Sequence, residues 1–416
     1  MKFIFPDSQD FVDPNFNFEL ETRSPTRVRQ RDDLYPHELL KSPPYDGVLV
    51  SKAVVDGSVA GAGKYTAAQR MRFLRSGVRE FFRLNKPEFK DLITMGDCGA
   101  FAYIREEVPP YTVEEVVTFY DEAGFDLGVA VDHIIGSYNA ELDQGLPGID
   151  AVPPEWRKRQ EITLQLATEF RAVHASRKSK FTPVAVAQGW SPASYAHAVT
   201  ELQKMGYDYI ALGGLVPLKT RDIVAAVRAV DVVRNSSTRL HLLGVTRLDS
   251  LKIFHGHGVA SFDSTSPLQR AFKDAKVNYY ADPEPYTAIR VPQVDGNPGL
   301  QRAIRSGKVA QDAAIKLERQ CLDLLQAFDK DQATEESVLD ALYSYSELHD
   351  TSSRVANYRR TLADRPWRDC SCQVCQDLGI NVMMFRGAER NRRRGFHNLY
   401  AFRNQMMGLV DECAAN

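Results

Sequence analysis

The alternation of short apolar runs with amphipathic stretches constrains the fold of this chain more than any other feature. From Tyr45 onward, runs rich in Val, Ile and Leu alternate with segments whose apolar residues recur every three or four positions. Such runs are typical of parallel strands that are buried on both faces and joined by helices. The predicted strands are residues 47–51, 92–95, 127–131, 183–187, 209–212, 240–244 and 259–262. The predicted helices between them are residues 66–84, 113–123, 155–176, 193–205 and 219–233.

Seven strand–helix units can be read from this pattern, and an eighth would close the sheet on itself. A chain with so many consecutive units is expected to form a closed (β/α)8 barrel, known as a TIM barrel, within the α/β class. An open, doubly wound sheet is the alternative fold. In either fold the carboxyl ends of the parallel strands meet at one edge, where a functional site is expected.

Three cysteines and one histidine near the C-terminus have the spacing of a structural metal site. Cys370, Cys372 and Cys375 lie within six residues, and His397 follows 22 positions later in a segment with helical periodicity. Zinc prefers four such ligands in a tetrahedron, and Cys3His sites leave no position open for water. The spacing therefore predicts a structural zinc site, and the alternative is three unrelated buried thiols with a surface histidine. Because a structural zinc performs no chemistry, the catalytic site is expected elsewhere.

These features divide the chain into four expected parts. Residues 1–45 are polar and proline-rich and are expected to form an N-terminal arm or cap. The barrel is expected at 46–295, a helical segment inserted after it at 296–365, and the C-terminal zinc-binding subdomain with a closing helix at 366–416.

Composition places bounds on the cellular setting and on the partners. The formal net charge is −2, so the chain as a whole does not call for a polyanionic partner, and local basic clusters must be judged individually. Six cysteines are few for 416 residues, which is typical of a reducing compartment. The N-terminus lacks the apolar core of a signal peptide, and no run approaches the length of a membrane span. We therefore expect a soluble, cytoplasmic protein with no membrane partner.

Polar and glycine residues stand at the ends of several predicted strands. They are Asp97, Asp132, Gln188, the pair Gly213-Gly214, and Asp263. A single Asp at such a position most often caps the following helix. Three carboxylates and an amide at the same edge of one sheet are harder to explain by capping alone. They predict an active site at the carboxyl ends of the strands.

Two basic clusters are candidates for contact with a nucleic-acid backbone. The first has three cations at roughly one-turn spacing shortly after Asp263, namely Arg270, Lys273 and Lys276. The second is the run Arg392, Arg393 and Arg394, between the last cysteine of the metal motif and His397. A solvated helix face is the alternative explanation for either cluster.

From about residue 90 to residue 410, these segments in order resemble the guanine transglycosylase family. Its members exchange a guanine base in nucleic acid for a 7-deazaguanine. The segment around Asp97 resembles the family's general acid/base segment, and Ser261-Phe262-Asp263 resembles the segment that carries its nucleophile. The ending Cys-x-Cys-x2-Cys…His-Asn-Leu resembles the family's zinc site and is the most specific part of the resemblance.

The resemblance implies a role for each candidate residue. Asp263 is expected to form a covalent glycosyl intermediate, and Asp97 is expected to protonate the departing guanine, which is the two-carboxylate logic of retaining glycosyl transfer. The implied base-binding residues are Asp132, Gln188, Gly213, Gly214, Leu215, Phe101 and Cys98. The implied cofactor is a structural Zn²⁺, and no nucleotide cofactor is needed because the glycosyl–enzyme bond stores the energy for the exchange.

The departures from the family pattern favour DNA over tRNA as the substrate. After the nucleophile, the stretch from Ser266 to Phe272 differs from the one with which tRNA enzymes grip the anticodon loop, and Cys98 replaces a usual serine. The opening Phe-Pro-Asp-Ser-Gln-Asp-Phe-Val-Asp-Pro resembles the DpdA branch, which is implicated in inserting 7-deazaguanine bases into DNA. The expected partners are therefore DNA and a 7-deazaguanine base, with preQ0 suggested by the branch.

Two other functions stay open on the sequence alone. The first is a tRNA-guanine transglycosylase with an unusual grip on its substrate. The second is a non-catalytic subunit that only binds nucleic acid, against which the presence of both Asp97 and Asp263 argues. The sequence leaves open the DNA sequence context, the oligomeric state, and whether helper proteins of a DNA-modification system open the duplex.

Overall fold

A computed structural model describes residues 1–59, 61–143, 151–348 and 355–414 of the chain. These residues divide into two units. The first unit contains Met1–Gln9, Tyr45–Thr265 and Met406–Asn416, and the second contains Asp10–Pro44 and Ser266–Gln405.

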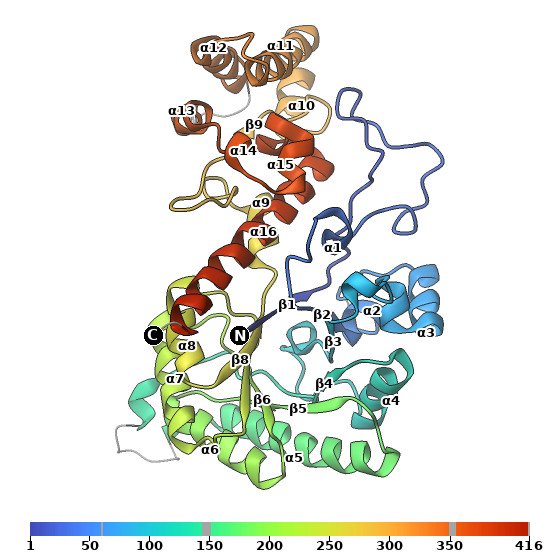
Figure 1. The fold of residues 1–416 in the computed structure, drawn as a ribbon, viewed down its shortest axis with the longest axis vertical. Coiled ribbons are helices and arrows are strands. Elements are labelled where there is room, and N and C mark those ends of the chain that lie inside the picture. The colour runs from blue at the N-terminus through green and yellow to red at the C-terminus, as the bar shows by residue number, and fades with distance from the viewer. Residues whose placement is uncertain (60, 144–150, 349–354, 415–416) are drawn as a thin grey trace. The chain divides into compact units, whose positions relative to one another are not determined.

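The first unit contains a closed barrel of eight parallel strands (Figure 1). Each strand pairs with the next along the chain, and β8 pairs with β1 to close the ring. The strands are β1 (Lys2–Pro6), β2 (Gly47–Ser51), β3 (Ile93–Asp97), β4 (Leu127–Val129), β5 (Thr182–Ala187), β6 (Tyr209–Leu212), β7 (Arg239–Leu242) and β8 (Val259–Asp263). This closure confirms the predicted (β/α)8 barrel and excludes the open, doubly wound sheet.

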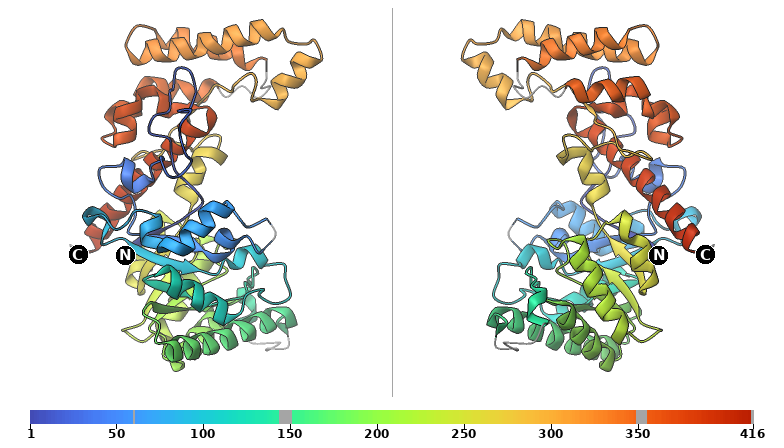
Figure 2. Two further views of the ribbon diagram at one scale, coloured as in Figure 1. Left: turned by 90° about the vertical axis from the view of Figure 1, so that its right-hand side faces the viewer. Right: turned by 90° about the vertical axis from the view of Figure 1, so that its left-hand side faces the viewer.

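Helices follow the strands and form the outer layer of the barrel (Figure 2). They are α2 (Lys52–Asp56), α3 (Ala67–Phe81), α4 (Val113–Ala123), α5 (Pro154–Arg177), α6 (Pro192–Lys204), α7 (Thr220–Val233) and α8 (Leu251–Gly256). Local sequence explains where several of them begin. In α4, for example, the hydroxyl of Thr112 accepts the Glu115 N–H while the Glu115 carboxylate accepts the Thr112 N–H, which forms a capping box.

Apolar side chains from the strands fill the inside of the barrel. The cluster includes Ile4, Leu49, Met95, Val129, Val184, Val186 and Ala211, all of which are buried. Successive strand residues point to opposite faces, so the alternate residues pack outward against the helices. The inside of the barrel is therefore a packed core, and the strand ends are free to carry polar groups.

The eighth strand lies in a segment that the sequence analysis assigned to the N-terminal arm. Residues Lys2–Pro6 form β1, which pairs with β2 on one side and β8 on the other. Phe3, Ile4 and Phe5 are all buried. The expected arm 1–45 is thus wrong for its first residues, because this short run completes the hydrogen bonding of two strands that would otherwise be sheet edges.

The expected barrel boundary at residue 295 also differs from the structure. The barrel strands end at Asp263, and the chain from Ser266 groups with the second unit. In that unit lie α1 (Pro36–Leu39), α9 (Ser266–Lys273), β9 (Ile289–Arg290), α10 (Pro298–Arg305), α11 (Gln311–Asp329), α12 (Glu335–Ser346), α13 (Val355–Asp364), α14 (Pro366–Asp369), α15 (Gln373–Leu378), β10 (Met384–Phe385) and most of α16 (Gly387–Ala414). The segment expected to be helical, 296–365, contains α10 to α13, of which α11 and α12 pack against each other.

Buried ion pairs attach residues 10–44 to the rest of the second unit. The Glu21 carboxylate accepts hydrogen bonds from Arg386 at 2.5 and 2.6 Å and also from Arg390. Glu389 accepts from Arg393 at 2.7 Å and from Arg23 at 3.1 Å. The N-terminal arm is therefore held by charges on α16 and on the residue just before it.

No described helix is both long enough and apolar enough to cross a lipid bilayer.

Candidate active site and metal centre

Three carboxylates stand at the carboxyl ends of barrel strands. Asp97 is the last residue of β3, Asp263 is the last residue of β8, and Asp132 follows shortly after β4. The charges of Asp132 and Asp263 both raise the pKa of Asp97, so the three groups lie close enough to interact. The structure thus brings together the three acidic residues that the sequence analysis singled out.

Asp97 has an unusual electrostatic setting. Burial raises its pKa to about 7, and the negative charges of Asp132 and Asp263 contribute to the increase. Hydrogen bonds from the backbone N–H groups of Cys98 and Gly99 oppose the increase. A carboxyl group with a pKa near neutrality can both donate and accept a proton at physiological pH, which suits a general acid/base.

Asp132 is the centre of a small hydrogen-bond network. Its Oδ2 accepts from the Gln188 side chain at 2.7 Å, and its Oδ1 lies 3.6 Å from the thiol of Cys98. The Tyr103 hydroxyl lies 3.0 Å from the same thiol and 3.2 Å from the backbone oxygen of Asp132. Burial raises the pKa of Asp132 to about 6, although the bonds from Gln188 and Cys98 lower it. The Cys98 thiol therefore contacts the Asp132 carboxylate directly, and Cys98 is fully buried.

The loop after β6 packs closely against Gln188. A Cβ atom on Gly213 would lie 2.2 Å from the Gln188 side-chain nitrogen, so only glycine fits there. The backbone N–H groups of Gly214 and Leu215 have no hydrogen-bond acceptor among the described residues. They are therefore available to a polar edge of a ligand. Phe101, in the turn after β3, has an exposed side chain.

Asp263 is held by two groups, neither of which was among the site residues expected from the sequence. Its Oδ1 lies 3.1 Å from Nε2 of His241 on β7, and the backbone N–H of Gly244 donates to the same oxygen at 2.9 Å. His241 is fully buried. Its sequence signal was a polar residue inside an apolar strand, and only the pairing of β7 with β8 shows which carboxylate it contacts.

The predicted metal ligands converge in the second unit. The ligand atoms of Cys370, Cys372, Cys375 and His397 all lie within 4.8 Å of one another. The three sulfur atoms lie 3.4, 3.5 and 3.3 Å from Nδ1 of His397. A tetrahedral zinc site with usual bond lengths separates sulfur from nitrogen by roughly 3.5 Å, so these residues could hold a metal of that kind.

Neighbouring groups orient the metal-binding histidine. The Nε2 of His397 lies 2.8 Å from the backbone oxygen of Tyr280, to which it can donate a hydrogen. This contact leaves Nδ1 unprotonated and facing the thiols, as metal ligands require. The ring of Tyr279 stacks on the imidazole at a centroid distance of 3.8 Å, and its hydroxyl lies 3.2 Å from the Cys375 sulfur.

The two basic clusters differ in the structure. Arg270, Lys273 and Lys276 are all exposed, on α9 and just beyond it. Arg392 is partly buried and makes no hydrogen bond or ion pair with any described residue. Burial lowers the pKa of Arg392, and the positive charges of Arg29 and Arg23 lower it further.

Arg393 and Arg394 do not fit the predicted role in nucleic-acid binding. Both are buried, and Arg393 pairs with Glu389. Arg394 donates to the backbone oxygens of Val382, Met384 and Ala271. These guanidinium groups are occupied inside the second unit, because α16 places every third or fourth residue on its buried face. The prediction is therefore corrected for these two residues.

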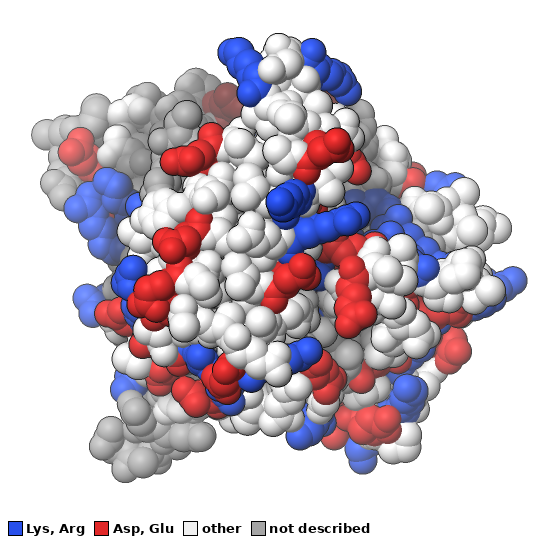
Figure 3. All heavy atoms as spheres, turned by 90° about the horizontal axis from the view of Figure 1, so that it is seen from above, with Lys and Arg blue, Asp and Glu red and all other residues white. Residues whose placement is uncertain are grey.

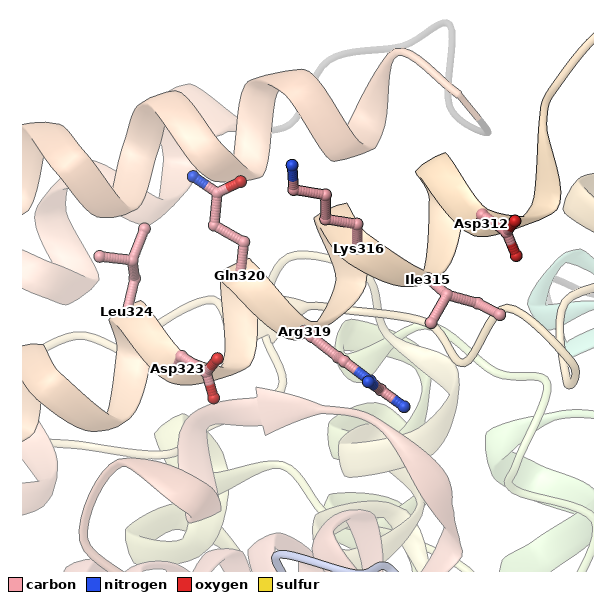
Figure 4. Close-up of a pocket in the computed structure, with 7 residues that line it drawn as sticks. All are labelled: Asp312, Ile315, Lys316, Arg319, Gln320, Asp323 and Leu324. Atoms are coloured by element: carbon pink, nitrogen blue, oxygen red, sulfur yellow. The ribbon is translucent and has the colours of Figure 1, made fainter.

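A surface hollow on α11 does not resemble a ligand-binding site such as the one at the strand ends. All of its lining residues come from that one helix (Figure 4): Asp312, Ile315, Lys316, Arg319, Gln320, Asp323 and Leu324. It mixes charges of both signs, and described acidic and basic side chains are likewise interspersed over the face in Figure 3. A single helix face does not enclose a base in the way that ligand pockets do.

Two known proteins are similar to this chain. A DNA-guanine transglycosylase of Salmonella montevideo is 50% identical over 411 residues, which cover 98% of this chain and 96% of that protein. A tRNA-guanine(15) transglycosylase of Thermococcus kodakarensis is 27% identical over 175 residues, which cover 41% of this chain and 27% of that protein. No protein-family model matches the sequence.

Proposed function

This chain belongs to the guanine transglycosylase family, and we propose that it replaces guanine in DNA with a 7-deazaguanine base, preQ0, through a covalent intermediate on Asp263. The near-complete match to a DNA-guanine transglycosylase carries the proposal of DNA as the substrate. The convergence of Asp97, Asp132 and Asp263 at the strand ends supports the proposed chemistry.

In the first half of the reaction, an oxygen of Asp263 attacks C1′ of the target nucleotide. The bond from C1′ to the guanine nitrogen breaks, its electron pair stays with the base, and Asp97 supplies a proton to the departing guanine. The pKa of about 7 at Asp97 supports this step, because much of the group is protonated at neutral pH. The product is a glycosyl ester of Asp263.

In the second half, the incoming 7-deazaguanine replaces guanine in the pocket. Asp97, now ionised, takes a proton from the incoming base, whose nitrogen attacks C1′ and releases the Asp263 carboxylate. Atoms and charge balance over the two halves, and the ester conserves the energy of the original bond. No nucleotide cofactor is therefore needed for the exchange.

The pocket around Asp132 would recognise the base. Asp132 accepts hydrogen bonds from the N–H edge of a guanine-like ring, and Gln188 with the backbone at Gly213, Gly214 and Leu215 binds the remaining polar edge. The free N–H groups of Gly214 and Leu215 support this assignment. Phe101 stacks on the ring face, and its exposed side chain is available for that contact.

The Cys370, Cys372, Cys375 and His397 cluster would hold Zn²⁺ as a structural ion. With four protein ligands the ion keeps no open position, so its contribution is to the folding of the second unit and not to the reaction. The sulfur-to-nitrogen distances and the orientation of His397 support zinc over harder cations, which prefer oxygen ligands.

DNA binding would require the target guanine to leave the base stack, which costs a few kcal/mol. The exposed cations Arg270, Lys273 and Lys276, and the unpaired Arg392, are the proposed phosphate contacts. Binding through such contacts releases counterions, so the affinity for DNA should fall steeply as salt concentration rises. An affinity independent of salt would rule out these contacts.

The test of this function uses purified protein and its Asp263→Ala variant, each incubated with preQ0 and either plasmid DNA or tRNA. Nucleosides from each digest are then identified by mass spectrometry. We expect a 7-deazaguanine deoxynucleoside in DNA with the wild type and none with the variant. Modification of tRNA alone would return the chain to the tRNA-modifying branch, to which the relative with the shorter match belongs. Product in neither nucleic acid, with no covalent adduct, would favour a binding subunit.

A further inference from the structure

A chain of hydrogen bonds runs through the barrel interior and ends at Asp263. The Tyr209 hydroxyl on β6 lies 2.5 Å from the Ser261 hydroxyl on β8. That hydroxyl lies 2.6 Å from Nδ1 of His241 on β7, whose Nε2 lies 3.1 Å from Asp263. All four residues are buried.

Counting the hydrogens shows which group donates in each of these hydrogen bonds. If Tyr209 donates to Ser261, then Ser261 donates to Nδ1 of His241, and the remaining Nε2–H donates to Asp263. Every hydrogen then has an acceptor. In the reverse direction, the imidazole would carry hydrogens on both nitrogens, and the buried Tyr209 hydroxyl hydrogen would have no acceptor among the described residues. The first arrangement is favoured, with a neutral imidazole protonated at Nε2.

The backbone of Gly244 supplies a second donor to the same oxygen. Gly244 has a φ of +73°, and a Cβ there would lie 2.5 Å from the Val216 side chain, so this N–H direction depends on glycine. His241 and Gly244 both bond Oδ1 of Asp263. The other oxygen, Oδ2, has no hydrogen-bond partner among the residues that the structure describes.

We propose that His241, fixed as its Nε2–H tautomer by Ser261 and Tyr209, is a positioning residue that holds Oδ1 of Asp263 and leaves Oδ2 to attack C1′. This inference rests on the proposed role of Asp263 as nucleophile. A neutral imidazole orients the carboxylate without cancelling its negative charge, which an imidazolium would do. In the glycosyl ester, Oδ1 becomes the carbonyl oxygen, and the same two N–H donors can stay bonded to it.

The experiment follows single-turnover adduct formation with guanine-containing DNA in four variants. We expect His241→Leu to slow adduct formation about 100-fold, as a misplaced nucleophile does, while the affinity for preQ0 stays unchanged. His241→Gln should recover about tenfold of that loss, because its amide N–H can still donate to Oδ1. Tyr209→Phe should slow the step several-fold.

Tyr207→Phe is the matched control. It also removes a buried tyrosine hydroxyl, one that donates to the Ala167 backbone oxygen at 2.7 Å and has no link to Asp263. It should leave the rate of adduct formation unchanged. If the wild type forms the adduct and His241→Leu forms it as fast, the positioning role is overturned while the proposed function stands. If the wild type and all variants form no adduct, the nucleophile assignment fails and this role fails with it.

A second readout does not depend on activity. Nitrogen-15 NMR of histidine-labelled protein distinguishes the two imidazole tautomers, and the His241→Gln variant identifies the signal of His241. We expect the Nε2–H form in the wild type, and a shift of that signal in Tyr209→Phe but not in Tyr207→Phe. A doubly protonated ring or an Nδ1–H tautomer in the wild type would overturn the inference.

Discussion

The two units of this protein treat buried charge in opposite ways. In the barrel, Asp97 and Asp132 accept no hydrogen bond from a cationic side chain within the described residues, and burial raises their pKa values to about 7 and about 6. In the second unit, burial alone would raise the pKa of Glu21, but hydrogen bonds from Arg386 and Gln293 bring it down to about 2. Asp97 and Asp132 in the first unit thus lack a cationic partner among the described residues, whereas Glu21 in the second unit is paired with two arginines.

This difference distinguishes carboxylates suited to catalysis from carboxylates that stabilise the fold. An unpaired buried carboxylate costs stability and gains the ability to exchange protons near neutral pH. A paired one is fixed in its charged form and is useful for attaching chain segments. The arginine run of α16 was predicted to bind phosphate. In the structure, Arg393 pairs with Glu389 and Arg394 bonds the Ala271 backbone, so both stabilise the second unit.

The largest expected effect concerns the metal centre, which would bind the second unit together more strongly than any ion pair. We expect Cys375→Ser to lose the metal and to destabilise that unit by on the order of 5 kcal/mol, because binding energy of a structural zinc is folding energy. Metal analysis and thermal unfolding measure both. Cys321→Ser, at a buried thiol outside the cluster, is the control and should keep the metal. Full metal content in Cys375→Ser would show that Cys375 is not a required metal ligand and would contradict this prediction.

A smaller loss is expected when a paired carboxylate is neutralised. Glu21→Gln leaves Arg386 and Arg390 without their shared partner and should destabilise the protein by about 3 kcal/mol at pH 7. Since the folded pKa of about 2 lies below the ordinary value of 4.5 for a glutamate, this contribution is present above pH 4.5 and is lost as pH falls toward 2. Urea unfolding at pH 7 and pH 3 should therefore show a shrinking difference.

The control for this variant is Glu284→Gln, which disturbs an exposed pair with Arg360. Its effect should stay below about 1 kcal/mol. Equal effects of the two variants would mean that burial of the Glu21 pair has no energetic consequence.

Neutralising an unpaired carboxylate should change stability in the opposite direction. The folded pKa of Asp97, about 7, lies above the ordinary value of 3.8 for an aspartate, so its cost to folding is absent below pH 3.8 and develops as pH rises toward 7. Asp97→Asn should stabilise the protein by on the order of 2 kcal/mol at pH 8 and hardly at all at pH 4, while base exchange falls. Asp249→Asn, at an exposed position, should change stability at neither pH. Destabilisation by Asp97→Asn at pH 8 would contradict the electrostatic picture of the site.

The smallest effect is expected at Cys98. Its thiol is a weak donor to Asp132 at 3.6 Å, and a serine hydroxyl can take over that contact. Cys98→Ser should change the affinity for the base and the rate of adduct formation by less than about threefold, a difference below 1 kcal/mol. Binding titration and single-turnover kinetics measure the two quantities. A loss of more than tenfold would show that the thiol has a role that serine cannot fill.

Local patterns in the sequence were enough to predict most of the architecture. The alternation of apolar runs with amphipathic stretches predicted the barrel, because strand and helix periods depend on near neighbours. The cysteine spacing predicted the metal cluster for the same reason. The grouping of Asp97, Asp132 and Asp263 followed from one rule of topology, that the carboxyl ends of parallel strands meet at the same face.

Only the tertiary structure decided the features that depend on distant partners. The run Lys2–Pro6 is followed by a polar, proline-rich stretch and not by an amphipathic helix, so its strand is recognised only when β2 and β8 lie on either side of it. Arg393 and Arg394 were predicted to be surface cations from the sequence, whereas in the structure α16 buries both inside the second unit. His241 contacts Asp263 only because β7 pairs with β8, which places His241 opposite Ser261 and two residues from Asp263. Sequence determines what each segment can form, whereas the burial and partner of a charge depend on contacts that only the folded chain makes.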